Sequence, residues 1–329
     1  MYLLMALLGA LAVTNPPAVT TNALPETRLA AKAPDPNDPA EQAFRKLMAE
    51  DDAAHAEVDR LIKDNQNFAE KGGGVSGASL NGRIKQRLGQ VRDAYEAFLR
   101  QHPDHARARV AFASFLSDQG EEDAAFIHLE KARTLDPGNP AVWNQLANYY
   151  GHNGPVSMAF PYYEKAIELE PNEPVYYQNL GLTVYLFRRD ATNYYHLGEP
   201  AVFEKAMALY RKALALDPEN FVLATDFAQS YYGYKPRPTG DPAADRQAQE
   251  KHFADAMAAW QTAFKLARDD IERQGVLIHF ARLQINAGRF AEARQNLHGA
   301  TNAMFNATRQ QLLKNLENKS KAPAPAAKP

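Results

Sequence analysis

The sequence of 329 residues contains no cysteine. Without thiol groups the chain forms no disulfide, builds no zinc site on thiolates and offers no thiol nucleophile. It also has no cysteine near the N-terminus to carry a lipid. This absence is compatible with either an oxidising or a reducing compartment.

An excess of charge of one sign is also missing. The chain has 37 Lys and Arg against 39 Asp and Glu, which gives a net charge of -2. Nonspecific binding to nucleic acid or to a membrane surface requires a broad basic field. We therefore expect no nucleic-acid partner.

Motifs for catalysis are absent as well. The sequence holds no P-loop, no G-x-S-x-G, no H-E-x-x-H and no G-x-G-x-x-G that enters a helix. His102 and His105 are spaced like metal ligands, but they lie between two expected helices, where we expect Asp104 to cap the second. We therefore expect no enzyme activity, no cofactor and no metal.

Long apolar runs are limited to residues 2–13, which are too few to span a bilayer and match the length of a signal-peptide core. The run predicts export to the periplasm or beyond, with residues 1–23 as the signal. A cytoplasmic location is the alternative, because no Lys or Arg precedes the run. Residues 24–39 contain Pro25, Pro34, Pro36 and Pro39 and predict a linker. No membrane span is expected in the mature chain.

The chain does contain a sequence pattern that repeats at a fixed interval. Pro103, Pro137 and Pro171 follow one another at intervals of 34 residues. Before Pro171, two apolar stripes at helical spacing predict two antiparallel helices. The first stripe is Trp143, Leu146, Ala147 and Tyr150, and the second is Ala159, Tyr163 and Ala166.

The same pattern recurs on both sides of this unit. Upstream it gives Phe112, Ala113, Leu116, Ala125, Leu129, Ala132 and Pro137. Downstream it gives Tyr177, Leu180, Gly181, Val184, Ala206, Tyr210, Ala213 and Pro218. Two further copies without a closing proline follow, one through Phe227, Ala228, Tyr231, Ala256, Trp260 and Ala263, and one through Leu277, Phe280, Ala281, Phe290, Ala293, Leu297 and Ala300.

The order W-x-x-L-A-x-x-Y, A-x-x-x-Y-x-x-A and P is similar to the tetratricopeptide repeat signature, with Ala147 where Gly is more common. The resemblance covers residues 88–307. It implies an all-α solenoid, a right-handed superhelix of helix-turn-helix repeats in which each pair buries its apolar stripe on its neighbours. It also implies a non-catalytic scaffold for binding other proteins.

Outside these copies the pattern predicts caps. Residues 40–103 are expected to be a helical N-terminal cap or a degenerate repeat, started by Asp38. Repeats are expected over residues 104–307 and a capping helix over 308–318. The Ala-, Pro- and Lys-rich residues 319–329 are expected to form a disordered tail.

Two copies carry insertions between their helices, near residues 189–200 and 233–252. The interval from Tyr150 to Ala159 is 9 positions, whereas Val184 to Ala206 is 22 and Tyr231 to Ala256 is 25. Because both fall in the same turn of neighbouring repeats, we expect them to lie side by side. Tyr194 and Tyr195 of the first insert are candidate ligand contacts.

The first helices of the repeats are rich in amides on the side away from their core stripe, the side that lines the concave groove in tetratricopeptide proteins. The candidate contacts are Asn144, Gln145, Asn148, Gln178, Asn179, Asp226 and Gln229. Amides donate to and accept from an extended backbone, so they predict a peptide or protein partner in the groove. The alternative for these side chains is that they are only solvated. The alternatives for the function are a small-ligand pocket under the inserts and an oligomerisation module.

Overall fold

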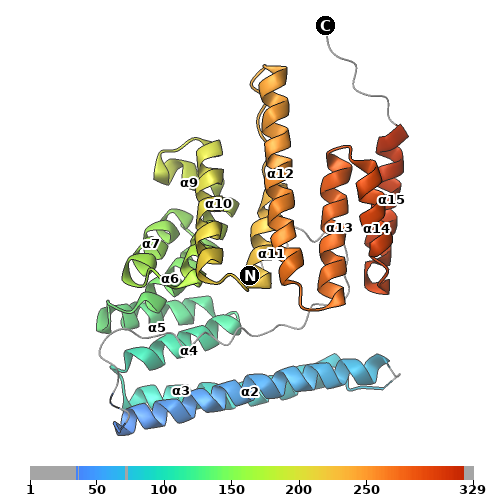
Figure 1. Ribbon diagram of the computed structural model, residues 1–329. Helices are drawn as coiled ribbons and strands as arrows, with labels where there is room; N and C mark the ends of the chain where they lie inside the picture. Colours follow the sequence, from blue (N-terminus) through green and yellow to red (C-terminus); the bar gives the residue numbers. More distant parts are fainter. Residues whose placement is uncertain (1–34, 36, 71–72, 322–329) are drawn as a thin grey trace. The chain divides into compact units, whose positions relative to one another are not determined.

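The structure is a computed structural model, and it describes residues 35, 37–70 and 73–321. Every regular element in this part of the chain is a helix (Figure 1). The expected signal, most of the linker and the tail beyond Lys321 lie outside the described residues. The chain divides into two compact parts, which meet in sequence between Asn179 and Leu180.

The first part consists of antiparallel helix pairs. Its helices are α2 (Pro39–Glu70), α3 (Gly77–Gln101), α4 (Ala106–Asp118), α5 (Glu122–Leu135), α6 (Pro140–Asn153), α7 (Ala159–Leu169) and the start of α8 (Pro174–Leu186), with a 3-10 turn at Val156–Met158. Polar side chains cap some of these helices, with Ser76 at the start of α3 and Asn139 at the start of α6. The expected cap at Asp38 is confirmed, since its carboxylate accepts from the Ala40 N–H at 2.9 Å.

The long hairpin of α2 and α3 is joined by buried polar groups. The Tyr95 hydroxyl donates to Asp51 Oδ2 at 2.6 Å, and His55 Nδ1 lies 2.9 Å from Asp51 Oδ1. The hydrogen bond that His55 donates to Asp51 raises the pKa of His55 to about 9 against the opposing effect of burial, so the imidazolium persists at neutral pH. A buried carboxylate is thereby paired with one cation and one hydroxyl.

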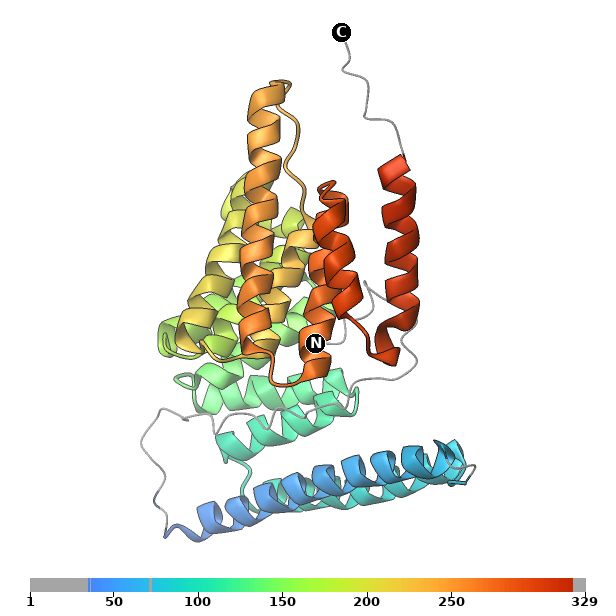
Figure 2. The same cartoon turned by 45° about the vertical axis from the view of Figure 1, so that its right-hand side comes forward.

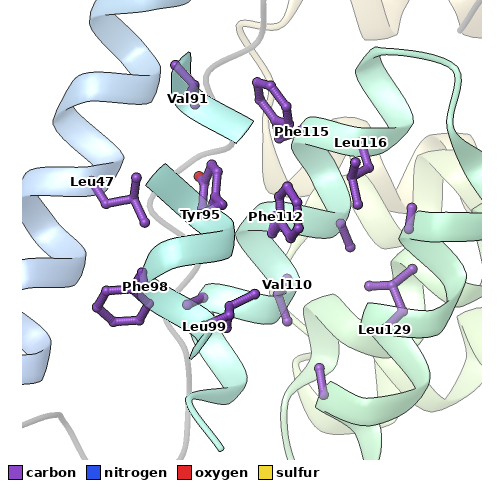
Figure 3. Packing of buried hydrophobic residues seen from close by; sticks show 14 of the residues in the cluster. Leu47, Val91, Tyr95, Phe98, Leu99, Val110, Phe112, Phe115, Leu116 and Leu129 are labelled. Carbon is purple, nitrogen blue, oxygen red and sulfur yellow. The ribbon is translucent and has the colours of Figure 1, made fainter. Parts of the chain in front are cut away.

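Aromatic packing extends this hairpin into the following pair (Figure 3). The Tyr95 ring stacks on Phe112 of α4 at 5.1 Å between centroids, and Phe115 lies 5.8 Å from Tyr95. Figure 3 places Leu47 of α2 on one side of these rings and Leu129 of α5 on the other. One continuous core therefore joins α2 to α5.

The repeat of α6 and α7 packs through small residues. Ala147, Ala159 and Ala166 are completely buried, which allows the two backbones to approach closely. Trp143 and Tyr150, expected in the core stripe, are instead partly exposed. The reason is visible at Trp143, whose indole N–H reaches out to the Pro137 carbonyl at 2.8 Å while Arg133 lies over its ring.

The second part continues the pairs with α9 (Arg188–Tyr195), α10 (Glu199–Leu216), α11 (Phe221–Ser230), α12 (Pro242–Leu266), α13 (Asp270–Asn286), α14 (Phe290–Gly299) and α15 (Asn306–Lys321), with 3-10 turns at Tyr231–Gly233 and Ala303–Phe305. Gly181 of α8 packs against α10, because a Cβ there would lie 3.3 Å from Leu209. A local core joins α13, α14 and α15. The expected capping helix falls within α15, which also takes in Lys319, Ser320 and Lys321 from the expected tail.

Both inserts change the helices around them. The first forms the short helix α9, and the second forms an extended stretch, residues 234–241, that leads into the 25 residues of α12. Figure 2 shows this stretch running beside the N-terminal half of α12. The pair made of α11 and α12 is therefore unequal, because α11 has 10 residues.

Candidate functional site

The amides of α6 and α8 form a hydrogen-bonded row. Asn144 is 7% exposed, and its Oδ1 accepts from Asn179 Nδ2 at 3.0 Å. Asn148 is partly exposed and accepts from the buried Tyr163 hydroxyl at 2.7 Å. Burial therefore keeps Asn144 from being an accessible groove contact, and its role is to hold Asn179 in place.

Two glutamines complete this row with partly exposed side chains, Gln145 on α6 and Gln178 on α8. Gln145 forms no side-chain hydrogen bond with any of the described residues. The row is neutral, with donors and acceptors in every amide. It is able to satisfy both the N–H and the C=O groups of an extended backbone.

On α11, Asp226 and Gln229 occupy the corresponding positions of their own repeat and are partly exposed. The Asp226 carbonyl accepts from Ser230 Oγ at 3.0 Å, a bond within the helix. Gln229, like Gln145, has no side-chain hydrogen bond among the described residues. Gln229 offers an amide like those of the row, whereas the carboxylate of Asp226 only accepts hydrogen bonds.

Tyr194 and Tyr195 end α9, and both are partly buried. Their rings meet edge to face at 4.8 Å, and the Lys205 ammonium of α10 lies 4.1 Å from the centre of the Tyr195 ring. Such cation–π contacts hold a ring in one orientation. Tyr195 is therefore part of the packing of α9 on α10, and Tyr194 lies against its edge.

The expectation that the inserts lie side by side is confirmed within residues 180–321. Arg188, at the start of α9, donates to the Gly233 carbonyl at 3.1 Å. Glu199 is paired with both Arg188, at 3.9 Å, and Arg237. The ring of Tyr234 stacks on Phe203 at 4.1 Å with an interplanar angle of 10°.

Sequence reasoning missed Glu199, Phe203, Tyr234 and Arg237. The available signal was the pair of prolines at positions 236 and 238, which restrict Lys235 and Arg237 to extended backbone. This signal indicates an extended segment but does not identify the helix that it packs against.

His105 has a structural role. Its Nδ1 accepts from the Ala108 N–H at 3.0 Å and its Nε2 lies 3.2 Å from the buried Glu41, which also pairs with Arg107. His105, and not Asp104 as expected, therefore caps α4. Burial lowers the pKa of His105, since it disfavours the charged form. In the described part of the chain no cluster of His, Asp and Glu has the arrangement of a metal site.

No helix among residues 35, 37–70 and 73–321 has the length and apolar character needed to cross a membrane. No curated protein matches the sequence significantly. The sequence pattern of the tetratricopeptide repeat matches residues 140–173, the unit of α6 and α7.

Solved structures with the same fold include that of PilF from Pseudomonas aeruginosa, which is 16% identical, with a TM-score of 0.50 over 82% of this chain and 100% of that one. A second is PilW, a widely conserved type IV pilus biogenesis factor, which is 14% identical, with a TM-score of 0.51 over 72% of this chain and 95% of that one. At these identities the likeness concerns the fold. Proteins with this repeat are generally scaffolds for protein interaction. The chain thus contains a tetratricopeptide repeat at residues 140–173 and has the all-α repeat fold of tetratricopeptide repeat proteins.

Proposed function

We propose that the chain is a non-catalytic scaffold that holds an extended segment of a partner protein against the amide row of α6 and α8. The observation that carries the proposal is the bond between Asn179 and the buried Asn144. It fixes one amide of the row beside the partly exposed Gln145 and Gln178. A pre-oriented amide loses little entropy when it binds a backbone group.

Within residues 180–321, Gln229 is proposed as an amide contact and Asp226 as an acceptor on α11, and Tyr194 and Tyr195 are proposed as aromatic contacts on α9. Asn148 takes part through its free amide hydrogens, since its oxygen already accepts from Tyr163. The neutral character of the amides favours a partner that is recognised through its backbone and not through its charge.

The test is affinity capture from an extract of the native host, followed by mass spectrometry. Gln145→Ala and Gln229→Ala each remove an amide that supports no bond within the described chain, so folding should change by less than about 0.5 kcal/mol. Each should weaken capture, because a lost hydrogen bond costs ~0.5–1.5 kcal/mol. The matched control is Gln86→Ala, which removes an exposed glutamine from α3. Loss of the partner in the control alone, with full capture by both row variants, would show that the binding surface lies elsewhere.

Export is proposed from residues 2–13, which lie outside the described residues. Fractionation of the native host tests it. A cytoplasmic protein that retains these residues would contradict it.

A further inference from the structure

An extended segment of the second insert is seated on α10 through two side chains. Tyr234 stacks on Phe203, and Arg237 pairs with Glu199. We call residues 234–239 the strap. It lies between Gly233 and Gly240, and the backbone of Gly240 has a positive φ of 93°, a conformation that favours glycine.

The spacing of the two contacts follows from backbone geometry. Lys235 and Arg237 each precede a proline, which restricts them to extended or polyproline II backbone. Polyproline II has three residues per turn, so Tyr234 and Arg237 fall on one side of the strap. Their partners, Glu199 and Phe203, are four residues apart on α10 and therefore also share one face. Because Tyr234 meets Phe203 and Arg237 meets Glu199, the strap runs antiparallel to α10.

The seat on α10 has both an apolar and a charged end. Phe203 is 2% exposed, and the rings of Tyr231 and His252 lie 5.8 and 6.1 Å from it. At the other end, Glu199 lies between the guanidinium groups of Arg188 and Arg237. An aromatic surface beside a carboxylate is the chemistry that recognises proline-containing segments with an aromatic and a basic residue.

The contacts that hold the strap are weak individually. The Arg237 side chain is 76% exposed, and exposed ion pairs contribute little to stability. The ends are held by the bond from Arg188 to Gly233 and by Thr239, which donates from its backbone and hydroxyl to Asp245 at 2.6 and 2.8 Å. Between these end contacts the strap is held by the Tyr234 ring, which stacks on Phe203 and lies 5.9 Å from the His252 ring, and by one exposed ion pair.

We propose that the Glu199–Phe203 face of α10 is a docking site for an extended, proline-containing segment of a partner that carries an aromatic residue followed three positions later by an arginine, and that the strap occupies this site in the unbound chain. The occupant is specified by the strap itself, which shows what the face binds. The site is independent of the amide row, since none of its residues belongs to that row.

The test uses the full chain and a fluorescently labelled peptide with the sequence of residues 233–241, GYKPRPTGD. The variant Tyr234→Ala/Arg237→Ala, called the emptied variant, lacks the two strap side chains that contact Phe203 and Glu199. It should bind the peptide with a dissociation constant roughly tenfold lower than that of the wild type, because an intramolecular competitor reduces the apparent affinity. A peptide with alanine in place of the tyrosine and the arginine should not bind. Adding Glu199→Gln to the emptied variant should abolish most of the gain.

Two controls keep the result interpretable. Lys235→Ala alters an exposed strap residue and should leave peptide binding at the wild-type level. Arg237→Ala alone removes an exposed side chain and should preserve folding while it tightens peptide binding a few-fold. Gln145→Ala should not change peptide binding, which separates this site from the amide row.

The proposal is overturned if the emptied variant and Arg237→Ala, both folded by circular dichroism, bind the peptide no more tightly than the wild type. Equal binding of the alanine peptide would overturn it as well. So would a peptide that binds the wild type without raising hydrogen exchange in residues 234–239, because the peptide would then be bound elsewhere.

Discussion

The hairpin of α2 and α3 and the repeat of α6 and α7 are both antiparallel helix pairs, but they are held together by different chemistry. The hairpin buries the carboxylate of Asp51 between Tyr95 and His55. The repeat packs Ala147 and Ala159 without exposed area, so that its backbones approach closely. In this chain the hairpin adds a buried polar cluster to its apolar core, whereas the repeat depends mainly on the size of a few side chains.

The largest expected effect comes from removing the buried carboxylate of the hairpin. Asp51→Ala removes the partner of both His55 and the buried Tyr95 hydroxyl. We expect the free energy of unfolding to fall by about 3 kcal/mol, because breaking a buried pair leaves polar groups unsatisfied. The neighbouring Asp52 is exposed, so Asp52→Ala should change stability by less than about 0.5 kcal/mol. Urea unfolding measures both, and equal midpoints would contradict the role of Asp51.

The close packing of the α6–α7 repeat is tested by enlarging a small buried residue. Ala159→Leu adds three carbon atoms to a site with no exposed area and should cost ~1–3 kcal/mol, since a packed core resists added volume. Asn153→Leu, at an exposed position of α6, is the control and should cost much less. Similar melting temperatures for the two variants would show that the repeat is not packed as described.

A smaller effect is expected where the repeat adds a polar bond between α6 and α7. Asn148→Ala leaves the buried Tyr163 hydroxyl without its acceptor and should cost about 1 kcal/mol. Gln145→Ala, three residues earlier, should be nearly neutral. The measurement is again urea unfolding. Stability loss in Gln145→Ala equal to that in Asn148→Ala would refute the assignment of the Tyr163 bond.

The smallest expected effect is a change with pH in the stability that His55 contributes to the hairpin. The pKa of His55 is raised from 6.5 to about 9 in the folded chain, first by its bond to Asp51. Its stabilising contribution is therefore complete below about pH 6.5 and is lost as the pH rises through about 9. The stability difference between wild type and His55→Gln should shrink over this range. A constant difference would show that the charge on His55 does not stabilise the hairpin.

The fold was predictable because packing repeats at a fixed interval. Ala159 and Ala166 identify the inward face of α7, and both are completely buried. Periodicity does not say how deeply a neighbour covers that face. Trp143 and Tyr150 were therefore assigned to the core although they are partly exposed.

The candidate site was less predictable, because its contacts join residues far apart in the sequence. The amide row was inferred from position in the repeat, but the burial of Asn144 depends on a partner 35 residues away. The contact of Arg188 with Gly233 spans 45 residues and leaves no local pattern. Capping by His105 was missed because histidine is a less common cap than aspartate.

Gly233 has a consequence for how the inserts can be exchanged between proteins. A Cβ at this position would lie 1.9 Å from the Tyr185 hydroxyl, and its carbonyl is already bound by Arg188. An insert grafted alone into another scaffold would leave behind the surface to which this glycine is fitted. Residues 185–203 and 231–252 should therefore be transplanted, shortened or deleted as a single unit.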